Sequence, residues 1–160
     1  MSMIWEGRSL TAAEADGLKA DPELLEELVE EEGEAPLVAD LDKAWHGLHW
    51  VLTGAAWRTE APLAQAIMGG EEFGEDWGYG RPRLLDPTGV AAVATALGSI
   101  EADDLRARFD PDAMSAAELY PDVWDEEGIF DSYLLPYFEE LKALYAHAAA
   151  EGRWMLQTLT

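Results

Sequence analysis

"LDKAWHGLHWVLTG", residues 41–54, predicts the helix around which the rest of the chain packs. Asp40 or Asp42 suits its N-cap and Gly54 its end, so we expect a helix over about 41–53. With about 100° between successive residues, the apolar side chains fall on one stripe that faces the core. We expect Trp45 inside, and Trp50 and Lys43 pointing away from the stripe. The stripe comprises Leu41, Ala44, Trp45, Leu48, Val51 and Leu52.

A column of polar side chains, Asp42, His46, His49 and Thr53, lies beside this stripe. One interpretation is structural: His49 is half-buried and bonded to a backbone carbonyl or to Asp42, and Trp50 packs under a neighbouring loop. A second is that the column and Trp50 line a pocket for a small polar ligand or a partner peptide. In the third, His46 and His49 act as bases or metal ligands. Their spacing suits one metal ion, but the Glu of a His-Glu-x-x-His motif and a clear third ligand are missing, so we predict no metal and no cofactor.

A second candidate binding cluster lies in "ELYPDVWDEE", residues 118–127. Tyr120 and Trp124 bracket Pro121 and Asp122, so two amphipathic rings can converge there, although packing onto the core is the commoner role of such rings. Elsewhere the chain has no Gly-x-Ser-x-Gly elbow, no phosphate-binding Gly-Lys loop and no dinucleotide fingerprint. The glycine-rich and acidic segment 69–80 is expected to be a mobile surface loop. We therefore name no catalytic residue.

Composition and charge narrow the function classes. The chain has 160 residues, 49% hydrophobic, no Cys, and 33 acidic against 10 basic residues, which gives a net charge of −23. Such a field repels nucleic acids and anionic membranes. Solubility of the surface is the simplest interpretation of this charge, and attraction to a basic protein partner or imitation of nucleic-acid charge is the alternative. We expect no signal peptide and no membrane span, and therefore a cytoplasmic location.

The remaining patterns predict an α+β fold: one predominantly helical domain over 1–160 with a small sheet. The strands are expected at residues 3–7, near 79–85 and at 153–160, with Pro82 favouring an edge position for the second. Ser9 or Thr11 is expected to cap a first helix, and an outer solvated helix with eight acids and no base should follow at 21–34. Pro136 should break the last long helix, at about 128–150, near Leu135.

Three segments, "MSMI" (residues 1–4), "LDKAWHGLHWVLTG" (41–54) and "LRARFDPDAMSAAELYPDVWDEE" (105–127), together resemble the YfbM-like family of small bacterial proteins. Tyr120 and Pro121 match its Ile-Tyr-Pro signature, with Leu119 in place of Ile. The resemblance implies an α+β single domain with no agreed catalytic residues, and it makes His49 a better candidate for a polar role than His46. The central motif of the family is matched by Asp42, Lys43, Trp45, Leu48, His49, Leu52, Thr53 and Gly54.

These observations leave three hypotheses about function. The leading one is a non-catalytic cytoplasmic binding or protein-interaction module, whose partner is a basic protein or a small polar ligand. The first alternative is a small-molecule enzyme that uses His49 as general acid or base. The second is an acidic mimic of nucleic acid, or an antagonist of a basic protein.

Overall fold

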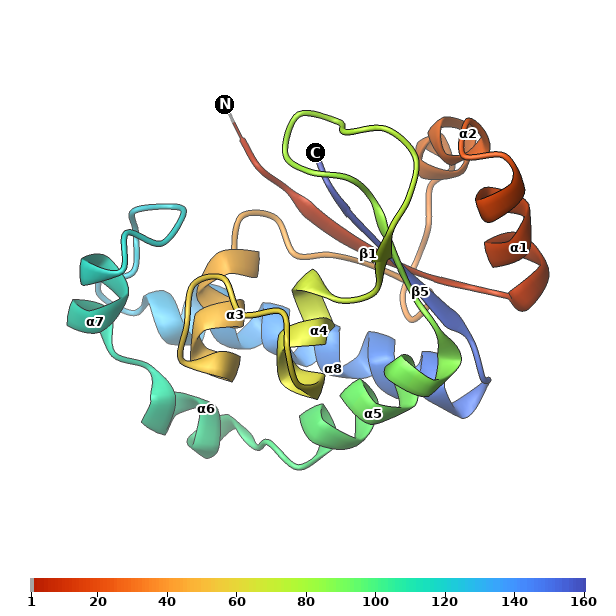
Figure 1. Cartoon of the computed structure of the whole chain (residues 1–160). Coiled ribbons are helices and arrows are strands. Elements are labelled where there is room, and N and C mark those ends of the chain that lie inside the picture. The colour runs from red at the N-terminus through yellow and green to blue at the C-terminus, as the bar shows by residue number, and fades with distance from the viewer. Residues whose placement is uncertain (1) are drawn as a thin grey trace.

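A computed structural model describes residues 2–160, and its centre is one five-stranded antiparallel sheet (Figure 1). The strand order is β2-β1-β5-β4-β3, so the two ends of the chain form the middle of the sheet. The α+β prediction and its three strands are confirmed. The strands are β1 (Trp5–Leu10), β2 (Val38–Asp40), β3 (Glu71–Glu72), β4 (Arg83–Leu85) and β5 (Trp154–Leu159).

Helices make up most of the remaining chain, and residue types at their ends explain where they begin. Thr11 and Glu14 form a reciprocal capping box at the first helix, and the Asp86 side chain caps α5. Pro136 falls in the first turn of α8, directly after a π-helical segment η1. The expected break near Leu135 is wrong, because Leu134 and Leu135 both keep helical backbone angles and the chain changes there from π-helix to α-helix. The helices are α1 (Ala12–Ala20), α2 (Leu24–Glu30), α3 (Trp45–Thr53), α4 (Pro62–Met68), α5 (Pro87–Gly98), α6 (Ala102–Arg108), α7 (Pro111–Ala116), η1 (Phe130–Leu134) and α8 (Leu135–Ala150).

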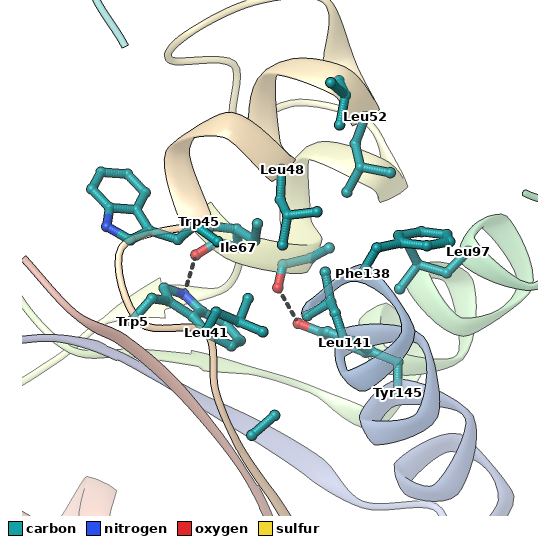
Figure 2. Packing of buried hydrophobic residues seen from close by; sticks show 14 of the residues in the cluster. Trp5, Leu41, Trp45, Leu48, Leu52, Ile67, Leu97, Phe138, Leu141 and Tyr145 are labelled. Carbon is teal, nitrogen blue, oxygen red and sulfur yellow. Dashed lines mark hydrogen bonds between the residues drawn. The ribbon is translucent and has the colours of Figure 1, made fainter. Parts of the chain in front are cut away.

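Helices cover both faces of the sheet, because alternate residues of the strands point to opposite sides. Met155 of β5 joins the large core with α3, α5 and α8, whereas its neighbour Leu156 joins a smaller core with α1 and α2. Figure 2 shows the large core, where Leu48 and Leu52 of α3 face α8 and α5, while the ring of Trp45 points to the other side of α3. Gly7 allows α8 to approach the sheet, since a Cβ there would overlap the ring of Trp5 and lie 2.8 Å from Leu144.

The central helix is shorter than expected: it begins at Trp45 instead of residue 41. The backbone of Leu41 donates to the carbonyl of Trp5, and Trp5 donates back to Asp42. These bonds extend the pairing with β1, and Asp42 adopts a left-handed conformation at φ 47°. Backbone pairing with a neighbouring strand therefore outweighs the helical periodicity of residues 41–44, and Asp42 does not cap the helix.

Two further expectations about the sheet are corrected. The segment near 79–85 is not an edge strand, because β3 pairs outside β4. Pro82 precedes β4 and accepts a hydrogen bond from Phe73 through its carbonyl oxygen. The segment 69–80 is therefore partly ordered by β3 rather than a loop throughout. Among residues 2–160, no helix combines the length and hydrophobicity that crossing a membrane requires; the cytoplasmic location stays a prediction.

Candidate functional site

His46 of α3 joins two loops that are far apart in sequence. Its side chain is 2% exposed, and its Nδ1 accepts the backbone N–H of Tyr120 at 2.9 Å. Because a backbone N–H can only donate, Nδ1 carries no proton, and Nε2–H donates to the carbonyl of Ala56 at 3.1 Å. Burial lowers the pKa of His46 and favours this neutral form. Both ring nitrogens are thus occupied by structural hydrogen bonds.

His49 is fully buried, with 0% exposure, and neither of its ring nitrogens has a hydrogen-bond partner of normal geometry. The expected half-buried position and the bond to Asp42 are therefore wrong, and the backbone contact of His49 with Arg58 falls outside normal hydrogen-bond geometry. Burial is the main cause that lowers the pKa of His49 to about 4, with a smaller contribution from His46. No solvent-exposed surface reaches this imidazole, so it lacks the access to substrate that a general base needs.

The rest of the predicted column does not converge on the histidines. Asp42 lies outside the helix, and its carboxylate accepts a hydrogen bond of 2.7 Å from the hydroxyl of Tyr133. Thr53 donates to the carbonyl of His49 at 2.8 Å and so satisfies the last turn of α3. Trp50 is half-buried against the large core, in line with the structural interpretation. The column is therefore a set of separate structural contacts.

The residues of the second cluster, 120–124, have different structural roles and do not form one site. Trp124 is 1% exposed and packs on Gly47, where a Cβ would overlap its ring. Tyr120 is half-buried, and its hydroxyl accepts the backbone N–H of Met3 at 3.0 Å. Asp122 is exposed. The two rings do not form a joint site, because one is core and the other ties the N-terminal segment to the loop.

A surface pocket lies next to these residues, beside Trp45. We call it the tryptophan pocket; it has a volume of about 240 Å³. Trp5 and Ile67 form part of its wall, held together by a 2.9 Å hydrogen bond from the Trp5 indole to the Ile67 carbonyl (Figure 2). Residues of five secondary-structure elements and two loops contribute: Trp5, Trp45, Trp57, Thr59, Ile67, Met68, Tyr79, Gly80, Arg81, Arg83, Gln157, Thr158 and Leu159.

Trp57 is the exposed aromatic wall of the tryptophan pocket. It is 68% exposed, the largest value among the exposed large hydrophobic side chains of the described chain. Its ring lies 4.5 Å from the ring of His46 and 6.3 Å from that of Trp45, measured between centroids. Since His46 also binds the Ala56 carbonyl, this histidine positions the loop that carries Trp57.

Charge distinguishes the tryptophan pocket from its surroundings. Arg81 and Arg83 line it, and its lining includes no Asp or Glu. Four other hollows on the described surface each have at least one carboxylate in their lining. Arg83 contacts Glu72 at 3.0 Å, whereas the structure gives Arg81 no ion pair within residues 2–160. The pocket can therefore accept a negative group.

The convergence of Trp57, Arg81 and Arg83 at this pocket was not predictable from periodicity. Trp57 stands in a polar loop, outside any periodic segment, so no helix pattern pointed to it. A usable signal was present in "RPR", residues 81–83, because two of only 10 basic residues fall within three positions of a strongly acidic chain. Which aromatic residues would meet them depended on the packing of β1 and α3.

A family model described as a domain of unknown function, DUF1877, matches residues 1–158. The chain belongs to the DUF1877 family. The protein YfbM of Escherichia coli (strain K12) is 31% identical over 127 residues, which cover 75% of each chain. The resemblance to the YfbM-like family is thereby confirmed.

The family fold is confirmed by a solved structure. The crystal structure of YfbM, a protein of unknown function from Escherichia coli, superposes with a TM-score of 0.76 and 22% identity, covering 98% of this chain and 99% of that one. At this identity the likeness concerns the fold. Membership in the DUF1877 family assigns neither a ligand nor a reaction, so function must be argued from the pocket itself.

Proposed function

We propose that this DUF1877 member is a non-catalytic binding protein whose tryptophan pocket takes a small planar anion, such as an aromatic ring with one carboxylate. The observation that carries the proposal is the exposed ring of Trp57 near Arg81, which has no ion pair within residues 2–160, in a lining without Asp or Glu on a chain of net charge −23. Trp5 and Trp45 form the buried part of the wall. Flat aromatic walls favour a ring, and a guanidinium favours a carboxylate.

The size of the pocket limits the ligand. Pockets for drug-sized ligands have volumes of about 300–1,000 Å³, and the tryptophan pocket has about 240 Å³. A single substituted ring is therefore a better fit than a nucleotide. Trp57 adds an exposed face on which part of the ligand can stack outside the enclosed volume.

The negative charge of the whole chain does not prevent an anion from binding locally. At physiological ionic strength the Debye length is about 8 Å, so distant carboxylates are screened. Arg81 and Arg83 both line the pocket, but the Arg83 guanidinium is already paired with Glu72 at 3.0 Å, so Arg81 is the main source of their positive charge for a bound ligand. Their local attraction therefore outweighs the remote field.

The alternative of a His49-dependent enzyme has less support, because the imidazole is 0% exposed and lines none of the hollows described above. The alternative of a nucleic-acid mimic stays a prediction, motivated by the net charge of −23. Neither alternative accounts for a carboxylate-free pocket with two arginines.

Isothermal titration calorimetry with benzoate, benzamide and benzylammonium tests the proposed ligand class. These probes share a ring and differ in charge, so we expect benzoate to bind most tightly and benzylammonium least. Arg81→Gln should weaken benzoate binding by roughly fivefold, as expected for one lost charge-assisted contact, and leave benzamide unchanged.

Arg106→Gln is the matched control, since it alters net charge equally but lies on α6, where Arg106 pairs with Asp131. Trp57→Ala should weaken benzoate and benzamide alike, because it removes the shared stacking face. Equal affinity for all three probes, or equal effects of Arg81→Gln and Arg106→Gln, contradicts the proposed site.

A further inference from the structure

The helices α1 and α2 leave part of their apolar surface uncovered. Leu18 and Leu25 turn into the smaller core against the sheet and are 3% and 2% exposed. Leu24 of α2 is 42% exposed, and Leu28 is half-buried. Figure 1 shows α1 and α2 together at one end of the molecule, away from α3 and α8. The two helices therefore present apolar residues outward as well as inward.

These outward residues line a groove of about 410 Å³ between the two helices, here called the α1–α2 groove. Leu24 and Leu28 contribute its exposed apolar lining, and the largely buried Leu18 completes it. Gly17 also lines it, and no heavy atom lies within 4 Å of the place where a Cβ would stand. The missing side chain leaves room for close approach of another backbone.

Three carboxylates, those of Glu14, Glu27 and Glu31, belong to the lining of the α1–α2 groove. No Lys or Arg of the described chain lines it. The nearest base along α1, Lys19, places its ammonium 3.8 Å from the ring centre of Trp154. Glu27 lies on α2 and Glu31 directly follows its last residue, so both carboxylates add negative charge to the same groove and repel each other. A positively charged neighbour would relieve this repulsion.

We propose that the α1–α2 groove is a docking surface for a basic amphipathic helix of a partner protein. Apolar side chains on one face of that helix would contact Leu24 and Leu28, close to Gly17. Lys or Arg residues on its flanks would pair with Glu27 and Glu31. This is the helix-in-groove mode of peptide recognition, with the specificity set by charge. The surface is separate from the tryptophan pocket, so the two proposals can fail independently.

Charge also excludes the other occupants of such a groove. A second copy of this chain would bring another net charge of −23 to an acidic surface. Nucleic acids and anionic membranes are repelled for the same reason. Within the described residues, no Lys or Arg of the groove could anchor a phosphate. A basic protein segment is the occupant that the groove's carboxylates favour.

Fluorescence anisotropy with three labelled synthetic peptides tests this surface. The first is an amphipathic helix of Lys and Leu, the second has the same composition in an order without an apolar face, and the third replaces every Lys by Glu. We expect saturable binding of the first peptide alone, weakened by added salt. Gly17→Arg, which fills the groove and adds a positive charge, should abolish this binding.

Matched variants locate the binding. Leu24→Ser combined with Glu27→Gln should weaken the first peptide by about tenfold, because a central apolar contact and a flanking charge are both lost. Leu37→Ser combined with Glu127→Gln makes the same changes at exposed residues outside the groove, Leu37 being 39% exposed, and should change the affinity less than about twofold.

Three results would overturn the proposal. One is equal binding of the first two peptides, which would mean attraction to net charge alone. Another is equal weakening by the groove variant and the matched variant. The third is no binding of the first peptide at about 0.1 mM in 50 mM salt, where exposed ion pairs are only weakly screened.

Discussion

His46 and His49 lie on the same helix, and both are buried, but only His46 makes hydrogen bonds. His46 fixes the loop of Trp57 through the Ala56 carbonyl and the segment of Tyr120 through its amide. Within residues 2–160, neither ring nitrogen of His49 has a partner of normal hydrogen-bond geometry. A buried imidazole without partners strongly prefers to be neutral, which makes its protonation a stability matter rather than a catalytic one.

The lowered pKa of His49 predicts how stability depends on pH. The unfolded imidazole binds a proton near pH 6.5, whereas the folded one does so only near pH 4. Between these values the unfolded state binds more protons, so the free energy of unfolding falls as the pH drops from 6.5 to 4. The contribution of His49 lost over this range is about 3 kcal/mol.

Urea denaturation of the protein and of His49→Phe, at several pH values between 4 and 7, measures that contribution. The phenyl ring keeps the volume of the site and cannot titrate, so the variant should lose less stability at acid pH. His46 and Arg58, the charged or titratable neighbours of His49, are retained in both proteins. If the free energy of unfolding has the same pH dependence in the two proteins, His49 does not take up a proton on unfolding.

Trp45 and Trp50 provide a second comparison at the scale of single residues. Trp45 is 1% exposed, and its indole donates to the Met3 carbonyl at 3.0 Å, whereas Trp50 is half-buried at the margin of the core. Trp45→Ala should reduce the free energy of unfolding by about 3–5 kcal/mol, and Trp50→Ala by clearly less. Urea denaturation at pH 7 gives both values. Equal losses would mean that the assignment of the two faces of α3 is wrong.

The apolar stripe of α3 was predictable from the sequence, because burial follows the helical period, and Leu48, Val51 and Leu52 are all buried. The burial and the contacts of the polar column, by contrast, were not predictable from the sequence. Side chains beside a core stripe become either exposed or buried according to what packs there, and here Trp124 and the loop of Ala56 cover the helix. Those contacts span long separations in sequence, which a periodic pattern does not encode.

Among the helical elements, Gly17 of α1 and Gly47 of α3 differ in the space available for a side chain. A methyl group at Gly17 would meet no heavy atom within 4 Å, whereas one at Gly47 would overlap the ring of Trp124. Gly17→Ala should stabilise the protein by about 0.5–1 kcal/mol, through reduced backbone entropy of the unfolded chain. Gly47→Ala should destabilise the protein by about 1–2 kcal/mol, because the steric overlap with Trp124 costs more than the reduced entropy of the unfolded chain contributes.

Thermal or urea unfolding of the two glycine variants checks the signs. Their circular dichroism spectra at 25 °C establish that both remain folded. Stabilisation by Gly47→Ala would show that Trp124 does not rest on α3 as described. A destabilising Gly17→Ala would contradict the open surface of α1 on which the α1–α2 groove depends.

Element boundaries were predictable where local chemistry determines them. Thr11 with Glu14 and Asp86 with Pro87 both act within one turn of the chain. The start of α3 was not predictable in this way, because the backbone of residues 41 and 42 pairs with Trp5, which is far away in the sequence. Strands β2 and β3 were missed for a related reason, since they have three and two residues and gain their order from the neighbouring strand.

At the scale of the whole molecule, the α1–α2 groove and the tryptophan pocket differ in the charge of the residues that line them. Carboxylates line the α1–α2 groove, which suits a basic helix, and arginines without carboxylates line the tryptophan pocket, which suits an anion. The two proposals therefore give a chain with a net charge of −23 two sites of opposite charge preference. Composition alone predicted the first preference; the second required the packing that brings Arg81 and Arg83 beside Trp5 and Trp45.

The most direct test of the account is to follow the indole N–H signals of the seven tryptophans by NMR during a benzoate titration. Residue assignments come from single Trp→Phe variants. We expect the signals of Trp5, Trp45 and Trp57 to shift together with one saturable dissociation constant, and those of Trp77 and Trp154, which line other hollows, to stay in place. Shifts confined to Trp77 or Trp154, or no saturable shift of Trp57, would contradict an anion site at the tryptophan pocket.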